Sequence, residues 1–199
     1  MALTGLLGGV FDPPHVGHVA LARAAVERLG LDELVVLVVA RPGHKRATTP
    51  AEVRLELARL AFAEVPRARV ELDPYPRTVD ALEARQLGDA VFVLGADELA
   101  DFPRWKRPER ILELVRLAVA RRPGVPDVEL REALARLSAP GRILFFELEP
   151  VPVSSSQVRA RIARGEPIDG LVPPAVAEAI ERLGLYRGAE YTASTTRED

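Results

Sequence analysis

The sequence predicts a doubly wound α/β domain, in which helices cover both faces of a mostly parallel sheet. Apolar runs of strand length alternate along the chain with longer segments of helical periodicity. The first two runs are apolar at nearly every position, which is typical of strands buried on two faces. This alternation favours crossover connections and therefore parallel strands. Because ligands of such sheets bind at the carboxyl ends of the strands, we expect functional residues in the segments that follow strands.

The first strand is expected over residues 3–9, where an apolar run ends in two glycines. A helix is expected over residues 16–29, because its apolar residues recur at nearly helical spacing and Gly30 is a typical C-terminal stop. The second strand is expected over the valine-rich residues 34–40. Thr49-Pro50-Ala51-Glu52 has the pattern of a capping box with proline at the first helical position, so it predicts a helix to about Glu64.

The rest of the chain continues this alternation. Further strands are expected over residues 70–73, 90–95, 115–120 and 143–148. Further helices are expected over residues 79–86, 128–137, 157–163 and 173–183, and one more helix closes at residues 111–114. Since no polar linker divides the chain, we expect one domain over residues 1–187 and a polar, disordered tail over residues 188–199.

Composition excludes several classes of protein. The 199 residues are 48% hydrophobic and 28% charged, which suits one folded domain and excludes a disordered or low-complexity chain. Lys and Arg number 27 against 29 Asp and Glu, so no global charge attracts nucleic acid or an anionic membrane. The absence of cysteine excludes disulfides and thiolate metal sites. With no basic leader and no apolar run of about 20 residues, we expect a cytoplasmic protein with neither nucleic acid nor membrane as partner.

The segment after the first strand reads GGVFDPPHVGH over residues 8–18. Its glycines permit close approach of backbone N–H groups to a ligand, and the helix that follows offers unpaired donors at its N-terminus. His15 and His18 are three residues apart, so both imidazoles lie on one side of the first helical turn. A metal site is the alternative, but no third ligand stands at a suitable spacing. The segment therefore predicts a phosphate site and no metal site.

Three other positions each have a functional and a structural interpretation. Ser154-Ser155-Ser156-Gln157 fits a plain capping box, although a cap and an anion site use the same donors. Asp97 follows a buried strand and could simply cap the next helix. Trp105, the one tryptophan, lies in a polar stretch, where an aromatic ring covers a helix end or stacks on a ligand.

Lysine is avoided in this chain, because only Lys45 and Lys106 accompany the many arginines. GC-rich coding or thermal adaptation accounts for such a bias. Where an arginine-rich chain retains lysine, however, a compact ammonium group is favoured.

Over nearly its whole length the chain resembles the nucleotidyltransferases marked by G-x-F-D-x-x-H-x-G-H, and within them the bacterial nicotinate-nucleotide adenylyltransferases. The signature matches except at Val10, where the family usually has Thr or Ser. The resemblance continues at His44-Lys45, Thr78-Val79-Asp80, Gly95-Ala96-Asp97, Trp105, Arg121-Arg122-Pro123-Gly124, Ser154-Ser155-Ser156-Gln157-Val158-Arg159, Leu171-Val172-Pro173 and Gly184-Leu185-Tyr186. It implies a Rossmann-like fold.

The resemblance also implies the reaction, which joins nicotinate mononucleotide to the adenylyl group of ATP and releases pyrophosphate. In-line attack by a phosphate oxygen on the α-phosphorus gives deamido-NAD and needs no protein nucleophile. Mg²⁺ is expected with ATP, bridging its phosphates. The implied catalytic residues are His15, His18, Lys45 and Arg159.

The implied substrate-binding residues form two sets. For ATP they are Gly8, Gly9, Phe11, His15, His18, Gly95, Asp97, Ser155, Ser156 and Arg159. For nicotinate mononucleotide they are Gly9, Lys45, Thr78, Ala81 and Trp105. The chain departs from the family pattern at Pro76, Arg77 and Ala81, which leaves open how strictly it prefers the acid to the amide.

Other functions remain as alternatives. Pantetheine-phosphate adenylyltransferase shares the serine-rich segment, but it usually has Thr at the position of His15 and lacks the counterpart of Trp105. Nicotinamide mononucleotide is the second alternative acceptor. A nucleotide-binding regulator without turnover is the third alternative, although intact His15, His18, Lys45 and Arg159 argue against it. The sequence leaves open whether the chain forms a homo-oligomer.

Overall fold

The computed structural model describes residues 2–43, 47–121, 127–149 and 151–187. Their strands form a six-stranded sheet in the order β3-β2-β1-β4-β5-β6, and every pairing in it is parallel. The predicted doubly wound, mostly parallel sheet is thereby confirmed. The strands are β1 (Thr4–Gly9), β2 (Glu33–Val39), β3 (Ala68–Asp73), β4 (Ala90–Gly95), β5 (Arg116–Arg121) and β6 (Ile143–Glu147).

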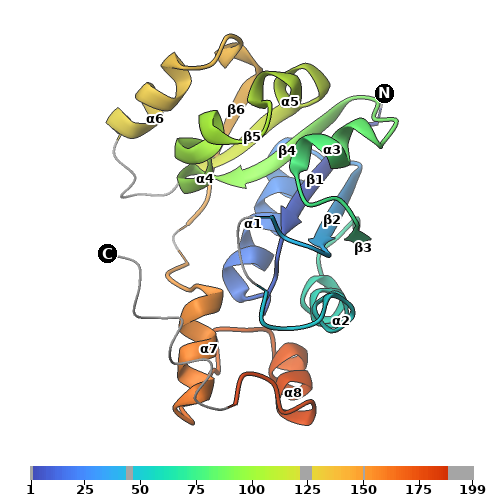
Figure 1. Cartoon of the computed structure of the whole chain (residues 1–199), viewed down its shortest axis with the longest axis vertical. Helices are drawn as coiled ribbons and strands as arrows, with labels where there is room; N and C mark the ends of the chain where they lie inside the picture. The colour runs from blue at the N-terminus through green and yellow to red at the C-terminus, as the bar shows by residue number, and fades with distance from the viewer. Residues whose placement is uncertain (1, 44–46, 122–126, 150, 188–199) are drawn as a thin grey trace.

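Helices connect successive strands and follow the last one (Figure 1). The α-helices are α1 (Val16–Leu29), α2 (Ala51–Phe62), α3 (Thr78–Glu83), α4 (Ala96–Asp101), α5 (Pro108–Leu114), α6 (Asp127–Ala135), α7 (Ser155–Ala163) and α8 (Pro174–Arg182). Two short 3-10 helices are η1 (Phe102–Arg104) and η2 (Pro140–Arg142).

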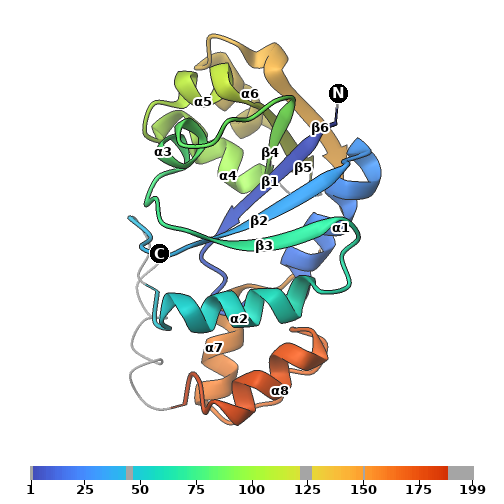
Figure 2. The same ribbon diagram turned by 90° about the vertical axis from the view of Figure 1, so that its right-hand side faces the viewer.

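The sheet separates two hydrophobic clusters, one for each layer of helices (Figure 2). Leu7 and Val36 pack toward α1, α2, α7 and α8, whereas Leu6 and Val35 pack toward α3, α4, α5 and α6. Successive side chains of a strand point to opposite faces, so a strand covered on both faces must be apolar at every position. This requirement explains the continuous apolar runs in the sequence.

Two local features differ from the sequence-based expectation. The capping box at Thr49 is not formed: α2 begins at Ala51, Pro50 occupies the cap position, and no side chain caps the helix. The fixed φ of proline suits the cap position, where Pro50 offers no side-chain acceptor. Helix α4 was not predicted, because Leu99 is the single large apolar side chain among its six residues and shows no helical period.

The strand order reverses at β1, which pairs with β2 on one side and β4 on the other. In an open parallel sheet, the carboxyl ends of two such strands lie at the point where ligands bind. The segment that carries both histidines leaves β1 at this point. Within the described ranges, no helix is long and apolar enough to span a bilayer.

Candidate active site at the carboxyl end of the first strand

The turn that leaves β1 is compact because the aromatic ring of Phe11 packs directly against Gly9. A Cβ atom at Gly9 would lie 2.6 Å from the ring of Phe11, so this position excludes larger residues. Phe11 has a φ of 51° and is buried. Its ring packs edge-on against His18 at 4.9 Å and against Phe62 of α2 at 5.5 Å. The side chain of Phe11 therefore supports the turn, and its backbone is the part left for a ligand.

His15 and His18 form one unit at the start of α1. His15 is the cap residue of the helix, and its ring stacks on that of His18 with 3.6 Å between centroids. The backbone N–H of His15 donates a hydrogen bond to Nδ1 of His18 at 3.2 Å. Because Nδ1 accepts, the hydrogen of the neutral His18 imidazole is on Nε2, which is a donor. Gly17 completes the pair, since a Cβ there would lie 3.1 Å from the His15 ring.

Asp12, between Phe11 and the histidines, is buried and accepts three strong hydrogen bonds. Thr48 donates its N–H at 2.6 Å and its hydroxyl at 2.7 Å to Oδ2, and the hydroxyl of Tyr186 donates to Oδ1 at 2.7 Å. Burial alone would raise the pKa of Asp12, but the surrounding hydroxyl groups of Thr49, Thr48 and Tyr186 outweigh burial and hold the pKa below its ordinary value. The carboxylate thus joins the turn to the start of α2 and to the segment after α8.

The start of α7 is bound to the same turn, although it lies far away in the sequence. Ser154 caps α7 by accepting a hydrogen bond from the N–H of Gln157 at 3.2 Å, as predicted. Ser155 donates its hydroxyl to the carbonyl of Pro13 at 2.8 Å, and Arg159 donates to the carbonyl of Asp12 at 2.7 Å. A second guanidinium nitrogen of Arg159 donates to Ser156 at 3.2 Å. Hydroxyl groups and one guanidinium are therefore held beside the segment that bears the histidines.

Arg54, a residue of α2, connects the carboxyl ends of β1 and β2. It is 1% exposed. One guanidinium nitrogen donates to the carbonyls of Val10 and Val39 at 2.7 and 2.8 Å, and the other two donate to Ala40 and Thr49 at 3.0 Å. Burial lowers the pKa of Arg54, and the charge of Asp12 opposes this shift. The backbone beside the histidine segment is thus fixed by a buried charge that satisfies four carbonyls.

Thr78, Ala81 and Trp105, three of the residues predicted for the pyridine nucleotide, lie in the other helical layer, whereas Gly9 ends β1. Thr78 begins α3, and Ala81 is buried, with its N–H donated to the carbonyl of Arg77 at 3.2 Å. The half-buried ring of Trp105 packs edge-on against Phe92 of β4 at 6.2 Å and is tilted against Phe102 at 5.3 Å. Trp105 is therefore positioned by the strand that adjoins β1.

At the end of β4, the polar groups belong to the start of α4. Gly95 caps the helix, and its N–H donates to the carboxylate of Glu98 at 2.6 Å. Asp97 lies exposed in the first helical turn, so Glu98 provides the capping contact that the sequence suggested for Asp97.

The cytidylyltransferase-like family matches residues 6–161 of this chain. A Thermus thermophilus protein named probable nicotinate-nucleotide adenylyltransferase is 42% identical over 192 residues, covering 92% of this chain and 98% of that protein. A Bordetella avium protein of the same name is 39% identical over 197 residues, covering 95% and 100%. The chain belongs to the nicotinate-nucleotide adenylyltransferases.

A solved structure of this family shows the same fold. Plasmodium falciparum nicotinic acid mononucleotide adenylyltransferase, complexed with NaAD, aligns with a TM-score of 0.75 at 16% identity, over 94% of this chain and 98% of that one. The Rossmann-like doubly wound fold that the resemblance implied is confirmed.

Sequence reasoning about this nicotinate-nucleotide adenylyltransferase missed Thr48 and Arg54, and it gave no role to Tyr186, which lies in the Gly184-Leu185-Tyr186 segment of the resemblance. The sequence pattern does mark Arg54. It lies at helical spacing from the apolar residues Leu57, Ala58 and Ala61, which form the buried face of α2. A charged residue in an apolar stripe is buried only with partners. No comparable pattern marks Thr48.

Some predicted features of the adenylyltransferase site lie outside the described residues. They are His44, Lys45 and residues 122–124 of the R-R-P-G segment, and the predicted tail over residues 188–199 lies outside the described residues as well. In the part of the chain that the structure describes, no group of three or more His, Asp or Glu side chains is arranged to hold a metal ion.

Proposed function

We propose that the protein transfers the adenylyl group of ATP to nicotinate mononucleotide, giving deamido-NAD and pyrophosphate, as a step of NAD biosynthesis. The names of the relatives support this activity. The observation that carries the chemistry is the stacked pair of His15 and His18, held by one turn beside the Arg159 guanidinium. These groups are donors or cations, as recognition of a polyphosphate requires.

In the proposed reaction, a phosphate oxygen of nicotinate mononucleotide attacks the α-phosphorus of ATP. A new oxygen–phosphorus bond forms as the bond to the bridging oxygen of the β-phosphate breaks, and that oxygen leaves with pyrophosphate. Both reactants carry negative charge, so the enzyme must hold two anions together and stabilise the charge that moves to the leaving group. No covalent enzyme intermediate is needed.

His18 is proposed to donate a hydrogen bond from Nε2 to a phosphate oxygen, since its Nδ1 is already an acceptor for His15. His15, adjacent in the stack, is assigned to the same phosphates. Ser155, Ser156 and Arg159 are proposed to bind the phosphates that depart, and Gly8 and Gly9 to let the ligand approach the backbone closely. Lys45 would add a point charge, and Gly95 and Asp97 are assigned to the adenosine side.

The donor set suits Mg²⁺ that arrives with ATP. Both carboxylate oxygens of Asp12, the acidic residue nearest the histidines in sequence, already accept hydrogen bonds. The described side chains assigned to the phosphates are imidazoles, hydroxyls and a guanidinium, which bind phosphate oxygens directly. When bound, Mg²⁺ would neutralise charge on the triphosphate.

On the acceptor side, Trp105 is proposed to stack on the pyridine ring, with Thr78 and Ala81 nearby and Gly9 beside the phosphate. An electron-poor pyridinium ring on an indole face is a favourable pairing. The nicotinate carboxylate is an acceptor, whereas the carboxamide brings N–H donors of its own. Backbone N–H groups at the start of α3 are proposed to bind this carboxylate. A site built on such donors rejects the wrong partner strongly, so we expect the acid to be favoured by at least about 100-fold in kcat/KM.

Pyrophosphate release, measured with ATP and each of three acceptors, tests the proposal. We expect turnover with nicotinate mononucleotide far above that with nicotinamide mononucleotide or pantetheine phosphate. Equal kcat/KM for the acid and the amide would replace this function with a dual-specificity adenylyltransferase. Binding of ATP without turnover on any acceptor would instead support the alternative of a nucleotide-binding regulator.

A further inference from the structure

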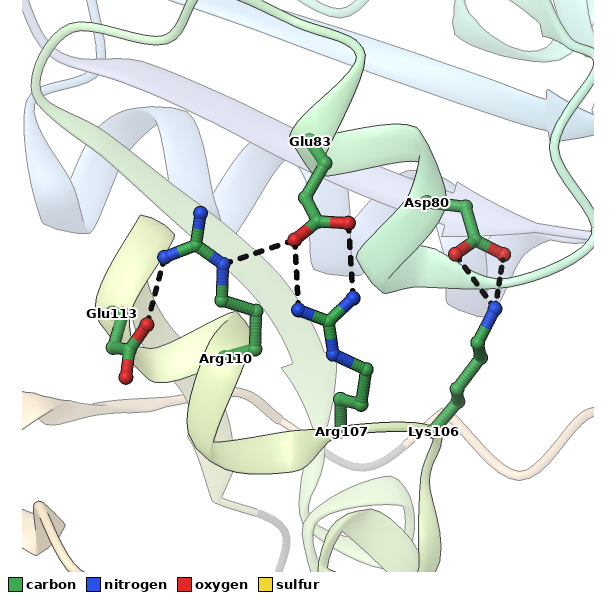
Figure 3. Close-up of polar contacts among 6 residues, drawn as sticks. All are labelled: Asp80, Glu83, Lys106, Arg107, Arg110 and Glu113. Atoms are coloured by element: carbon green, nitrogen blue, oxygen red, sulfur yellow. Dashed lines mark hydrogen bonds and ion pairs between the residues drawn. The ribbon is translucent and has the colours of Figure 1, made fainter.

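A network of ion pairs connects α3 with the segment that carries Trp105 (Figure 3). The ammonium of Lys106 contacts both carboxylate oxygens of Asp80, at 2.8 and 3.0 Å. Lys106 is the residue after Trp105, and Asp80 lies two residues after Thr78. The contact therefore joins two of the places assigned to the pyridine nucleotide.

Glu83, one helical turn further along α3, receives two arginines. Arg107 donates to both of its carboxylate oxygens, at 3.0 and 3.1 Å, and Arg110 donates to one of them at 3.0 Å. Arg110 also donates to Glu113 within α5 at 2.7 Å. Hydrogen bonds from Arg110 and Arg107 hold the pKa of Glu83 below its ordinary value. Both acidic side chains that α3 directs toward this segment are thus engaged (Figure 3).

The backbone between Trp105 and α5 needs these side-chain contacts. Arg107 caps α5 with a φ of 54°, in the left-handed region that L residues adopt at a cost. Its fork of two hydrogen bonds to Glu83 favours this conformation. On the other side, the N–H of Trp105 donates to the carbonyl of Phe102 at 2.9 Å. Contacts on both sides therefore hold the backbone from which the indole projects, and the ring itself packs on Phe92 and Phe102.

Stability of the fold does not account for the network. The pairs lie at the surface, where the side chains of Lys106 and Arg107 are 49% and 52% exposed. Exposed ion pairs add little to folding, because solvent and salt screen them. A contact that adds little to the stability of the fold can still strengthen ligand binding. If the side chain that binds the ligand is not already ordered, binding must order it, and the affinity falls.

We propose that Asp80 and Lys106 are positioning residues, which hold the Trp105 indole in register with the start of α3 and so set the affinity for the pyridine mononucleotide. Glu83, Arg107 and Arg110 support this contact by fixing the following turn. This inference rests on the proposed function, in which Trp105 stacks on the pyridine ring. The proposal also gives a role to Lys106, one of the two lysines in this arginine-rich chain. Its compact ammonium group contacts both carboxylate oxygens of Asp80 from the position next to Trp105.

The test compares Lys106→Met, Asp80→Asn and the double variant with the wild type. Trp105 is the one tryptophan, so its fluorescence reports directly on the indole during titration with nicotinate mononucleotide. We expect each single variant to raise Kd and KM for this substrate by about 3- to 10-fold, the range for ordering one side chain. We expect kcat and the KM for ATP to stay within about twofold, because the contact acts on ground-state binding of one substrate. The double variant should bind no more weakly than either single variant, as expected for two partners of one contact.

Arg104→Met is the matched control. It removes a cation next to Trp105, but the partner of Arg104, Asp101 at 2.6 Å, belongs to the same chain segment and not to α3. If Lys106→Met matches Arg104→Met in Kd, or if the two single effects add in the double variant, the positioning role is wrong while the proposed function stands. Wild-type protein that shows neither a fluorescence response nor turnover with this mononucleotide would overturn both.

Discussion

At the scale of residues, the described part of the site depends on side chains whose hydrogen-bonding direction is fixed by the backbone. The N–H of His15 occupies Nδ1 of His18, so that ring can donate only from Nε2 while it is neutral. The stack with His15 and the edge contact with Phe11 fix the plane of the ring. Preorganised donors of this kind stabilise charge in a transition state without reorganisation at the moment of reaction.

His18→Ala should therefore lower kcat by about 10²–10³, the typical cost of losing one transition-state donor. The free energy of unfolding should fall by only about 1 kcal/mol, because the substitution removes one cap contact. Pyrophosphate release gives the first quantity and urea unfolding the second. A His18→Ala enzyme with near-normal turnover would contradict the catalytic assignment.

A second prediction concerns Asp12, whose ionisation should make the stability of the fold depend on pH. The pKa of Asp12 in the folded protein lies below its ordinary value, so its contribution is complete above about pH 4 and is lost as the pH falls through the folded-state pKa. Asp12→Asn should lower the free energy of unfolding by about 1–3 kcal/mol at pH 7, since one oxygen that accepts hydrogen bonds is replaced by a donor.

Thermal or urea unfolding between pH 7 and pH 3 measures this effect, and the difference between wild type and Asp12→Asn should shrink below about pH 4. Asp89→Asn is the control, because Asp89 forms an exposed ion pair with Arg116 at 2.7 Å. A difference that stays constant at every pH would show that ionisation of Asp12 contributes nothing.

At the scale of elements, α7 matters through its first turn. Its cap and its Ser155 and Arg159 contacts bind it to the Asp12–Pro13 segment, so a helix late in the chain completes a site begun by β1. Arg159→Ala should weaken ATP binding by about 10- to 100-fold, the range for one charge-assisted hydrogen bond. Binding of nicotinate mononucleotide should change by less than twofold, as titration of each ligand would reveal.

Arg161→Ala is the control for this element, because Arg161 donates to the carbonyl of Pro167 at 2.9 Å, beyond α7. It should leave both affinities unchanged. Equal weakening of both ligands by Arg159→Ala would instead indicate that Arg159 only seats the last two helices.

At the scale of the whole molecule, the candidate site lies where the strand order reverses. There the carboxyl ends of β1 and its neighbours adjoin both helical layers. Arg54 fixes this meeting point by satisfying carbonyls that follow β1 and β2. Arg54→Met should lower the free energy of unfolding by at least about 3 kcal/mol, because several carbonyls lose a charged donor in a buried place. Arg59→Met, an exposed substitution on the same helix, should cost less than about 0.5 kcal/mol. Urea unfolding of both variants measures these changes. Similar losses of unfolding free energy in the two variants would show that the buried contacts of Arg54 do not stabilise the fold.

The sequence alone predicted the class of fold, because strands buried on both faces must be apolar throughout and helices must repeat every 3.6 residues. Residues 16–29 and 90–95 were predicted with the bounds that the structure has. The histidine segment was recognisable for a related reason, since its residues are close in sequence and their spacing within one helical turn is fixed by local geometry.

Tertiary structure decided everything that depends on residues far apart in the chain. It brought Ser155 and Arg159 to the turn beside the histidines, it placed Tyr186 on Asp12, and it joined Lys106 to Asp80. Each of these contacts depends on how strands, helices and loops are oriented around the sheet, which no local pattern records. A sequence determines the periods and caps of its elements by local sterics and hydrogen bonding, but partners across the sheet are selected only when the whole core packs.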